Sequence, residues 1–227
     1  MVFEFFRSPG RSTIESVEAT LVAMLRDGRT VFDSATEALF DSGKSKATKN
    51  EVRGTDRQIN QAEQEVRRAL IVHASVTDSI DFPLVLTYMS VVKDAERIGD
   101  YAKNIYDLVR YGSDFSDAPD RADLERYREA VGQLIDDVAN VFEERNTERA
   151  EQLIAKADGF LDEHDKNVRA AYTYDGSAAE AVSRALYFRF LKRTTAHLMN
   201  LLTALVMPVD RLDYYDEAKE DRDPAPE

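Results

Sequence analysis

Residues Tyr88 to Val109 read YMSVVKDAERIGDYAKNIYDLV and give the clearest indication of the architecture of this chain. Apolar or small side chains recur in it every three or four residues, at Tyr88, Val91, Ala95, Ile98, Ala102, Ile105 and Val109. Residues with this spacing lie along one face of an α-helix. The stretch therefore predicts a long helix with one buried face. Asp81-Phe82-Pro83 marks its start, because proline is tolerated in a first helical turn.

Five further segments are predicted to be helical, at about residues 14–41, 46–74, 120–145, 147–172 and 177–207. The first is expected to end at Asp41-Ser42-Gly43-Lys44, and Pro208 is expected to end the last, because glycine and proline interrupt helices. Residues 111–120 are rich in Gly, Ser, Asp and Pro, which favour turns. We therefore expect a linker there, with three helices on each side of it.

The two halves of the chain look like a repeat. The block ERIGDYAKN at residues 96–104 has a counterpart in KRTTAHLMN at residues 192–200, and DRQIN at residues 56–60 corresponds to DGFLD at residues 158–162. Helix triplets with stripes of this kind pack at shallow angles. We expect an all-α protein made of two pseudo-symmetric antiparallel three-helix bundles, at residues 1–113 and 119–211. An acidic tail at residues 212–227 is expected to be disordered.

Composition and charge narrow the range of functions. The chain has 227 residues, a net charge of −13 and no cysteine, so disulfides, thiolate metal sites and a cysteine nucleophile are excluded. A field of that sign repels nucleic acid and anionic lipid and attracts cations or basic partner surfaces. The N-terminal apolar run is too short for a signal peptide, and no later run approaches the roughly 20 residues that span a bilayer. We therefore expect a cytoplasmic protein that neither binds nucleic acid nor inserts into a membrane.

Glu96 and Asp100 form the sharpest local feature. Residues four apart lie one above the other on a helix, and two such carboxylates could bridge a hard or borderline cation. A helical wheel places both away from the Ala95/Ala102 stripe, so we expect the pair on an outer face that is open to partners. The alternative is a solvated face with local ion pairs, because Lys93 precedes Glu96 by three residues and Lys103 follows Asp100 by three.

The block VKDAERIGDYAKNI at residues 92–105 resembles the signature third helix of the PhoU family. The stretch from Asp56 to Glu63 resembles the partner motif of that family, and the resemblance covers roughly residues 14–207. It implies two symmetric three-helix bundles that bind metal ions through paired acidic motifs. It also implies a negative regulator of phosphate uptake that contacts a phosphate transporter component and a sensor histidine kinase.

The resemblance assigns candidate metal ligands by position, namely Asp56, Asn60, Glu96 and Asp100. Iron, Mn, Mg or Zn could be the ion. In the second half Asp158 and Asp162 remain, but the pair on the last helix has become Lys192 and Ala196. A lysine there would repel a cation or replace it with a salt bridge, so we expect one metal site rather than two.

Other candidate sites are weaker. Arg189, Lys192 and Arg193 form a basic cluster that could contact an anion or an acidic partner, or could simply pair with nearby carboxylates. His197 is expected to be a packing or hydrogen-bonding group. No Gly-rich phosphate loop or serine nucleophile motif is present. We therefore predict a regulatory adaptor, plausibly a homodimer, rather than an enzyme. The alternatives are an accessory protein of a different phosphate transporter and a metal-dependent phosphohydrolase.

Overall fold

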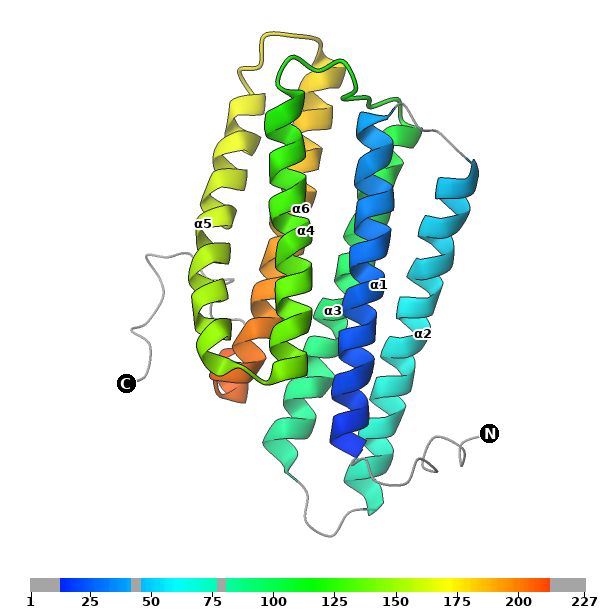
Figure 1. Ribbon diagram of the computed structural model, residues 1–227, viewed down its shortest axis with the longest axis vertical. Helices are drawn as coiled ribbons and strands as arrows, with labels where there is room; N and C mark the ends of the chain where they lie inside the picture. Colours follow the sequence, from blue (N-terminus) through cyan, green and yellow to red (C-terminus); the bar gives the residue numbers. More distant parts are fainter. Residues whose placement is uncertain (1–12, 42–45, 77–80, 213–227) are drawn as a thin grey trace.

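The computed structural model describes residues 13–41, 46–76 and 81–212 (Figure 1). In these residues the protein is all-α, with six long helices, one short 3₁₀ helix and no strand. The elements are α1 (Thr13–Phe40), α2 (Lys46–Val76), α3 (Phe82–Arg110), α4 (Arg121–Glu144), α5 (Thr147–Ala171), α6 (Ala178–Val206) and η1 (Val209–Arg211). The predicted helix bounds are therefore confirmed to within a few residues. The N-terminal apolar run and all but the first residue of the predicted acidic tail lie outside the described residues.

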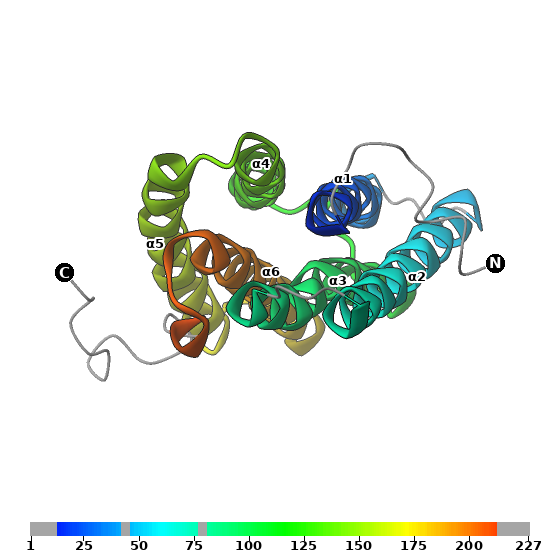
Figure 2. The same cartoon turned by 90° about the horizontal axis from the view of Figure 1, so that it is seen from below.

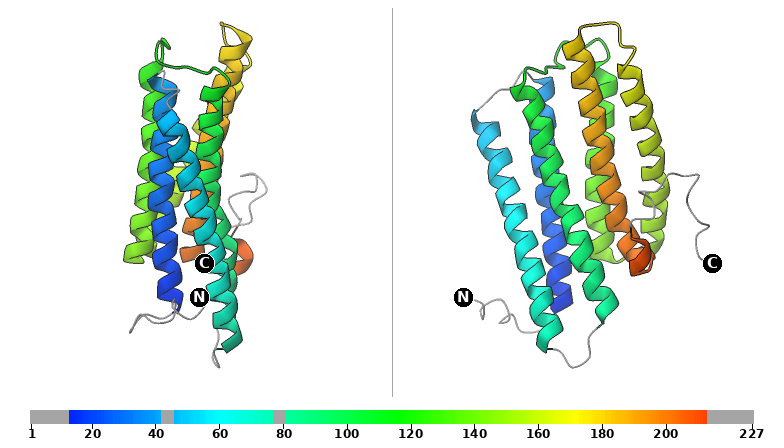
Figure 3. Two further views of the ribbon diagram at one scale, coloured as in Figure 1. Left: turned by 90° about the vertical axis from the view of Figure 1, so that its right-hand side faces the viewer. Right: turned by 180° about the vertical axis from the view of Figure 1, so that it is seen from behind.

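The six helices form two triplets that lie side by side. Viewed along the helices, α1, α2 and α3 pack together on one side and α4, α5 and α6 on the other (Figure 2). Seen from behind, α2, α3, α6 and α5 form one layer, with α1 and α4 behind it (Figure 3). The triplets meet where α3 packs on α6 and where α1 packs on α4. This arrangement is the predicted pair of three-helix bundles, whereas the residue bounds set for the two repeats stay a prediction.

Capping residues mark several of the helix ends. The Asp81 carboxylate accepts a hydrogen bond from the Leu84 backbone N–H at the start of α3. Ser177 and Glu180 form a reciprocal capping box at the start of α6. Arg145 ends α4 in the left-handed conformation with φ 53°, and Pro208 follows α6. The prolines and caps of the sequence thus fix the helix lengths locally.

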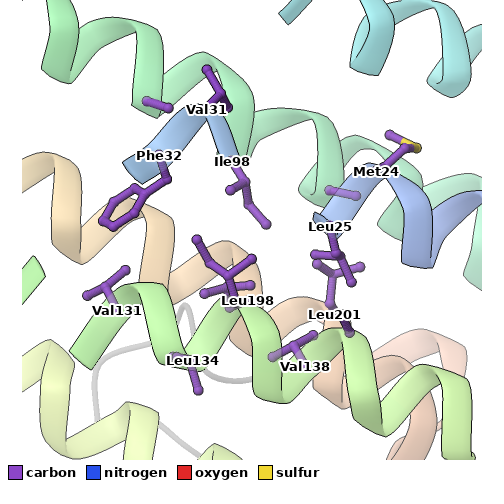
Figure 4. Close-up of a cluster of buried hydrophobic side chains, with 14 of the residues drawn as sticks. Met24, Leu25, Val31, Phe32, Ile98, Val131, Leu134, Val138, Leu198 and Leu201 are labelled. Atoms are coloured by element: carbon purple, nitrogen blue, oxygen red, sulfur yellow. The ribbon is translucent and has the colours of Figure 1, made fainter. Parts of the chain in front are cut away.

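One apolar core runs through both triplets. Its central part joins α1, α3, α4 and α6, and Figure 4 shows it with Met24, Leu25, Val31, Phe32, Ile98, Val131, Leu134, Val138, Leu198 and Leu201 labelled. The stripe predicted on α3 is buried at every position from Tyr88 to Val109. The triplets therefore share a core and are not two separately packed bodies.

A polar cluster interrupts this core at the junction of α3 and α6. The His197 ring stacks on the Tyr101 ring with centroids 5.6 Å apart. The Nδ1 atom of His197 lies 2.8 Å from Oδ1 of Asp94, and the Asn200 amide donates to the same oxygen at 3.1 Å. The predicted hydrogen-bonding role of His197 is therefore confirmed. Asp94 of α3 thus contacts two side chains of α6 and links the two triplets.

Another histidine, His164, is buried inside the α4–α6 triplet. His164 is 1% exposed and is surrounded by the rings of Tyr127, Phe160 and Phe188. Burial lowers its pKa to about 4, and the nearby Lys192 adds to this effect while Asp165 opposes it. His164 is therefore neutral in the folded protein over the physiological pH range.

We predict that this histidine makes the protein acid-sensitive. Below pH 6.5 the unfolded chain binds a proton at His164 that the folded chain rejects until about pH 4. The free energy of unfolding should therefore fall by up to about 3 kcal/mol between these two pH values. His164→Leu should flatten this part of a pH series of urea melts. A variant that keeps the wild-type slope would contradict the assignment.

Two glycines allow close helix contacts around α3, and we predict that a larger residue at one of them, Gly99, destabilises the protein. A Cβ atom at Gly99 would lie 3.0 Å from Ile59 Cδ1 of α2, and one at Gly28 would lie 3.1 Å from Ile98 Cγ2. Gly99→Leu should lower the free energy of unfolding by about 1–3 kcal/mol through overpacking. Gly159→Ala is the matched control, because Gly159 meets open space on α5 and alanine should stabilise that helix by about 0.5–1 kcal/mol. Chemical denaturation measures both, and a stable Gly99→Leu protein would show that α2 can move away.

We predict that Asp94→Ala weakens the junction between the triplets. The change leaves the partly buried His197 and the buried Asn200 without their common acceptor, which should cost about 1–3 kcal/mol. Asp123→Ala serves as control, because among the described residues Asp123 forms an ion pair with Arg126 of its own helix alone, at an exposed position. Equal melting curves for the two variants would argue against a role of Asp94 in joining the triplets.

Candidate functional site

The predicted acidic residues meet along the line where α2 packs against α3. Lys103 of α3 lies between two of them, because its Nζ atom is 2.9 Å from Oδ1 of Asp56 and 2.8 Å from Oδ1 of Asp100. The pKa of Lys103 is raised: burial lowers it, but the hydrogen bonds to Asp100 and Asp56 outweigh that effect. Asp100 also pairs with Arg97 at 3.1 Å. Asp56 and Asp100 are thus brought together, with an ammonium group between them.

Glu96 lies in a second charged group, beside the first. Lys93 Nζ is 2.7 Å from Oε2 of Glu96 and 3.9 Å from Oε1 of Glu63, and Glu63 pairs with Arg67 at 3.0 Å. Hydrogen-bond geometry is not met between Lys93 and Glu96, so Oε2 of Glu96 has a charged neighbour but no hydrogen-bond donor. We call Asp56, Glu63, Glu96 and Asp100 the α2–α3 acidic cluster.

The expected exposure of the pair was wrong for one of its members. The Glu96 side chain is only 5% exposed, whereas that of Asp100 is 24% exposed. The helical wheel placed both away from the apolar stripe of α3, but it could not show that α2 packs over that flank and covers Glu96. Only the Asp100 end of the pair reaches a surface open to partners.

The fourth candidate ligand, Asn60, turns its amide nitrogen to its own helix and donates to the Asp56 carbonyl oxygen at 2.8 Å. Over the described residues, three or more acidic or histidine side chains nowhere come together as a metal ion would require. The residues present do not fit a bound cation as they stand, because lysine ammonium groups lie against the carboxylates. The metal site implied by the resemblance stays a prediction.

Sequence reasoning named Lys93 and Lys103 only as neighbours of the acids on their own helix. Both of these local pairs form, with Glu96 and Asp100 respectively. It missed the contacts that the same lysines make with Glu63 and Asp56 on α2, and it did not single out Glu63 as part of the cluster. The antiparallel register of α2 and α3 decides these contacts.

The second repeat replaces the acidic pair with a salt bridge. Lys192, at the position that corresponds to Glu96, lies with Nζ 2.5 Å from Oδ2 of Asp165 on α5. Ala196 is buried and offers no ligand. Asp158 and Asp162, the acids that remain there, have interaction partners of their own. The salt bridge is one of the two outcomes expected of a lysine at this position.

The basic cluster of α6 does not act as one group. Lys192 is neutralised by Asp165, and Arg193 donates through Nε to the Tyr101 hydroxyl at 3.3 Å. Arg189 is exposed and has no ion pair with the described residues. Of the three cations, Arg189 is therefore the one available to an outside anion or acidic side chain.

The helices carry no candidate for a membrane-spanning segment within the described parts of the chain. Their solvent-facing sides are charged, in keeping with the many surface ion pairs between Arg or Lys and Asp or Glu.

Comparisons with known proteins agree with the sequence motif. Residues 21–109 match the family model of the PhoU domain. The crystal structure of PhoU from Pseudomonas aeruginosa superposes with a TM-score of 0.73 at 22% identity, covering 88% of this chain and 96% of that one. The phosphate transport system regulatory protein PhoU from Streptococcus pneumoniae superposes with a TM-score of 0.75 at 16% identity, covering 93% of this chain and 98% of that one. No curated protein matches the sequence.

The domain match includes α3 with the block at residues 92–105, and the two structural matches extend over both triplets. Residues 21–109 therefore resemble the PhoU domain, and the chain has the fold of the two solved PhoU proteins over most of its length.

Proposed function

We propose that this protein is a regulatory adaptor that lowers phosphate transport and phosphate-starvation signalling. The observation that carries the proposal is the PhoU domain at residues 21–109, which includes the acidic block of α3. The solved protein from Streptococcus pneumoniae with the same fold is described as a phosphate transport system regulatory protein. By this analogy, the partners are a phosphate transporter component, a sensor histidine kinase or both, and the protein acts in the cytoplasm as a homodimer.

The charge distribution supports a binding role over catalysis. A metal-dependent phosphohydrolase needs carboxylates that converge on one or two cations around a water molecule. Asp56 and Asp100 instead share Lys103, and Glu96 lies against Lys93. The regulatory proposal does not depend on a metal ion, because partner recognition needs only a surface of defined shape and charge.

Arg189 is the basic contact point that we propose for a partner. It is exposed on α6 and free of ion pairs with described residues in a chain that carries a net charge of −13. An exposed guanidinium group favours an acidic partner segment or a phosphate group. Lys192 and Arg193 flank it but are held by Asp165 and Tyr101.

We predict that deletion of the gene raises phosphate uptake and derepresses phosphate-starvation genes. Uptake of radiolabelled phosphate in phosphate-replete cells measures the first effect and a starvation-promoter reporter the second. Reintroduced wild-type protein should restore both to their original levels. Arg189→Glu, which reverses one exposed charge, should restore them less well at an equal protein level. Lys166→Glu, a charge reversal at an exposed position of α5, should act as wild type.

The outcomes separate the candidate functions. Unchanged uptake and signalling in the deletion strain would reject the proposal. Hydrolysis of a phosphoester by the pure protein with Mn²⁺ would favour the phosphohydrolase. A deletion phenotype confined to a different phosphate transporter would favour an accessory protein of that transporter.

A further inference from the structure

The α2–α3 acidic cluster consists of two neighbouring carboxylate pairs at the contact of two helices, Asp56 with Asp100 and Glu63 with Glu96, and each carboxylate has a cationic side chain beside it. We propose that Lys93 and Lys103 permanently supply the positive charge that this cluster needs, in the place where a PhoU domain is expected to hold a metal ion. The cluster of this protein is then complete without a metal. The inference is independent of the proposed role in phosphate regulation.

The position of Lys103 carries the first step of the argument. Its Nζ atom bridges Asp56 and Asp100 at 2.9 and 2.8 Å, which are the distances of strong charge-assisted hydrogen bonds. A divalent ion would have to lie about 2.0–2.6 Å from the same oxygens. An ammonium group and a metal ion cannot share that space, because they repel each other and compete for the same lone pairs. A metal ion could enter only if Lys103 left.

Burial carries the second step. The side chains of Glu96 and Glu63 are 5% and 9% exposed. A carboxylate so far from water is costly unless a positive charge lies close to it. Lys93 provides that charge for Glu96 at 2.7 Å, and Arg67 provides it for Glu63 at 3.0 Å. Both carboxylates therefore have a counter-charge within the protein, and no further cation is needed to offset their charge.

The second repeat also pairs a lysine with a carboxylate at the corresponding place, but with different residues. Lys192 corresponds to Glu96 and Asp165 corresponds to Glu63 when the two repeats are aligned by their motifs. These two residues form a direct salt bridge across α5 and α6 at 2.5 Å. Lysine-to-carboxylate contacts thus join both helix pairs. Lys93 and Lys103 make these contacts between α2 and α3, and Lys192, which stands at the position of Glu96, makes the contact between α5 and α6.

The test compares metal-dependent stability in wild type and in lysine variants. Each protein is first treated with a chelator, and its melting temperature is then measured in a MnCl₂ series and in NaCl of matched ionic strength, which accounts for screening of the large net charge. Titration calorimetry with MnCl₂ gives the number of bound ions. Wild type should melt at the same temperature in both salts and bind no stoichiometric Mn²⁺.

Lys93→Met with Lys103→Met should convert the cluster into a cation site. In NaCl this variant should melt below wild type, because its carboxylates have lost their counter-charges. Mn²⁺ binds only the folded form and should raise the melting temperature by about 5 °C or more at saturating concentration. Glu96→Gln and Asp100→Asn, added to the two lysine changes, should remove that rise. Lys156→Met is the matched control, since Lys156 lies on α5 and pairs loosely with Asp137 at 3.8 Å.

The proposal can also be tested if the double lysine variant is unstable. If the double lysine variant does not fold in NaCl, recovery of its helical circular dichroism on addition of Mn²⁺ supports the proposal, and failure to recover contradicts it. Lys103→Met alone should destabilise the protein less than the double change, because Asp56 and Asp100 are more exposed than Glu96. The proposal is overturned if wild type gains stability in Mn²⁺ beyond NaCl and Glu96→Gln with Asp100→Asn abolishes the gain. It is also overturned if the lysine variants gain no more than wild type.

Discussion

The packing of α3 against three neighbours is the contact on which the rest of the protein depends. Its apolar stripe is buried from Tyr88 to Val109, and the helix lies against α1, α2 and α6 at once. Gly28 of α1 lets Ile98 pack closely against α1, and Gly99 of α3 lets Ile59 pack closely against α3. A Cβ atom at either glycine would lie only 3.1 or 3.0 Å from the isoleucine side chain. Because one helix serves both triplets, the acidic cluster on its α2 side and the Asp94 cluster on its α6 side are held by the same rigid element.

Several cationic side chains of this strongly acidic protein lie where helices meet. Arg29 of α1 lies over Gly132 of α4 and pairs with Asp136 at 2.9 Å. Arg184 of α6 is buried and makes two hydrogen bonds of 2.6 Å to Asp120 at the start of α4. These contacts are partly buried, so salt screens them less than the pairs on exposed helix faces. Lys93 and Lys103 follow the same rule between α2 and α3.

The two repeats have kept one architecture and changed its chemistry. Tyr101 of the first repeat and His197 of the second occupy corresponding positions and stack on each other where α3 meets α6. Their neighbours differ, because Asp94 contacts His197 whereas its counterpart Phe190 packs near Tyr101. One side of the junction is therefore polar and the other aromatic.

The sequence by itself determined the helices and the architecture of this protein. Periodic stripes, the proline at the start of α3 and the proline after α6 act locally, so the six helices could be predicted to within a few residues. The block at residues 92–105 also identified the domain. Only the tertiary structure decided which charges meet across helices. Lys103 reaches Asp56 from a position 47 residues away in the chain, and α2 covers Glu96 on a flank that a helical wheel shows as free. The physical reason is that the net interaction of a charged group depends on burial and on distances of a few ångströms, and the register between packed helices sets both.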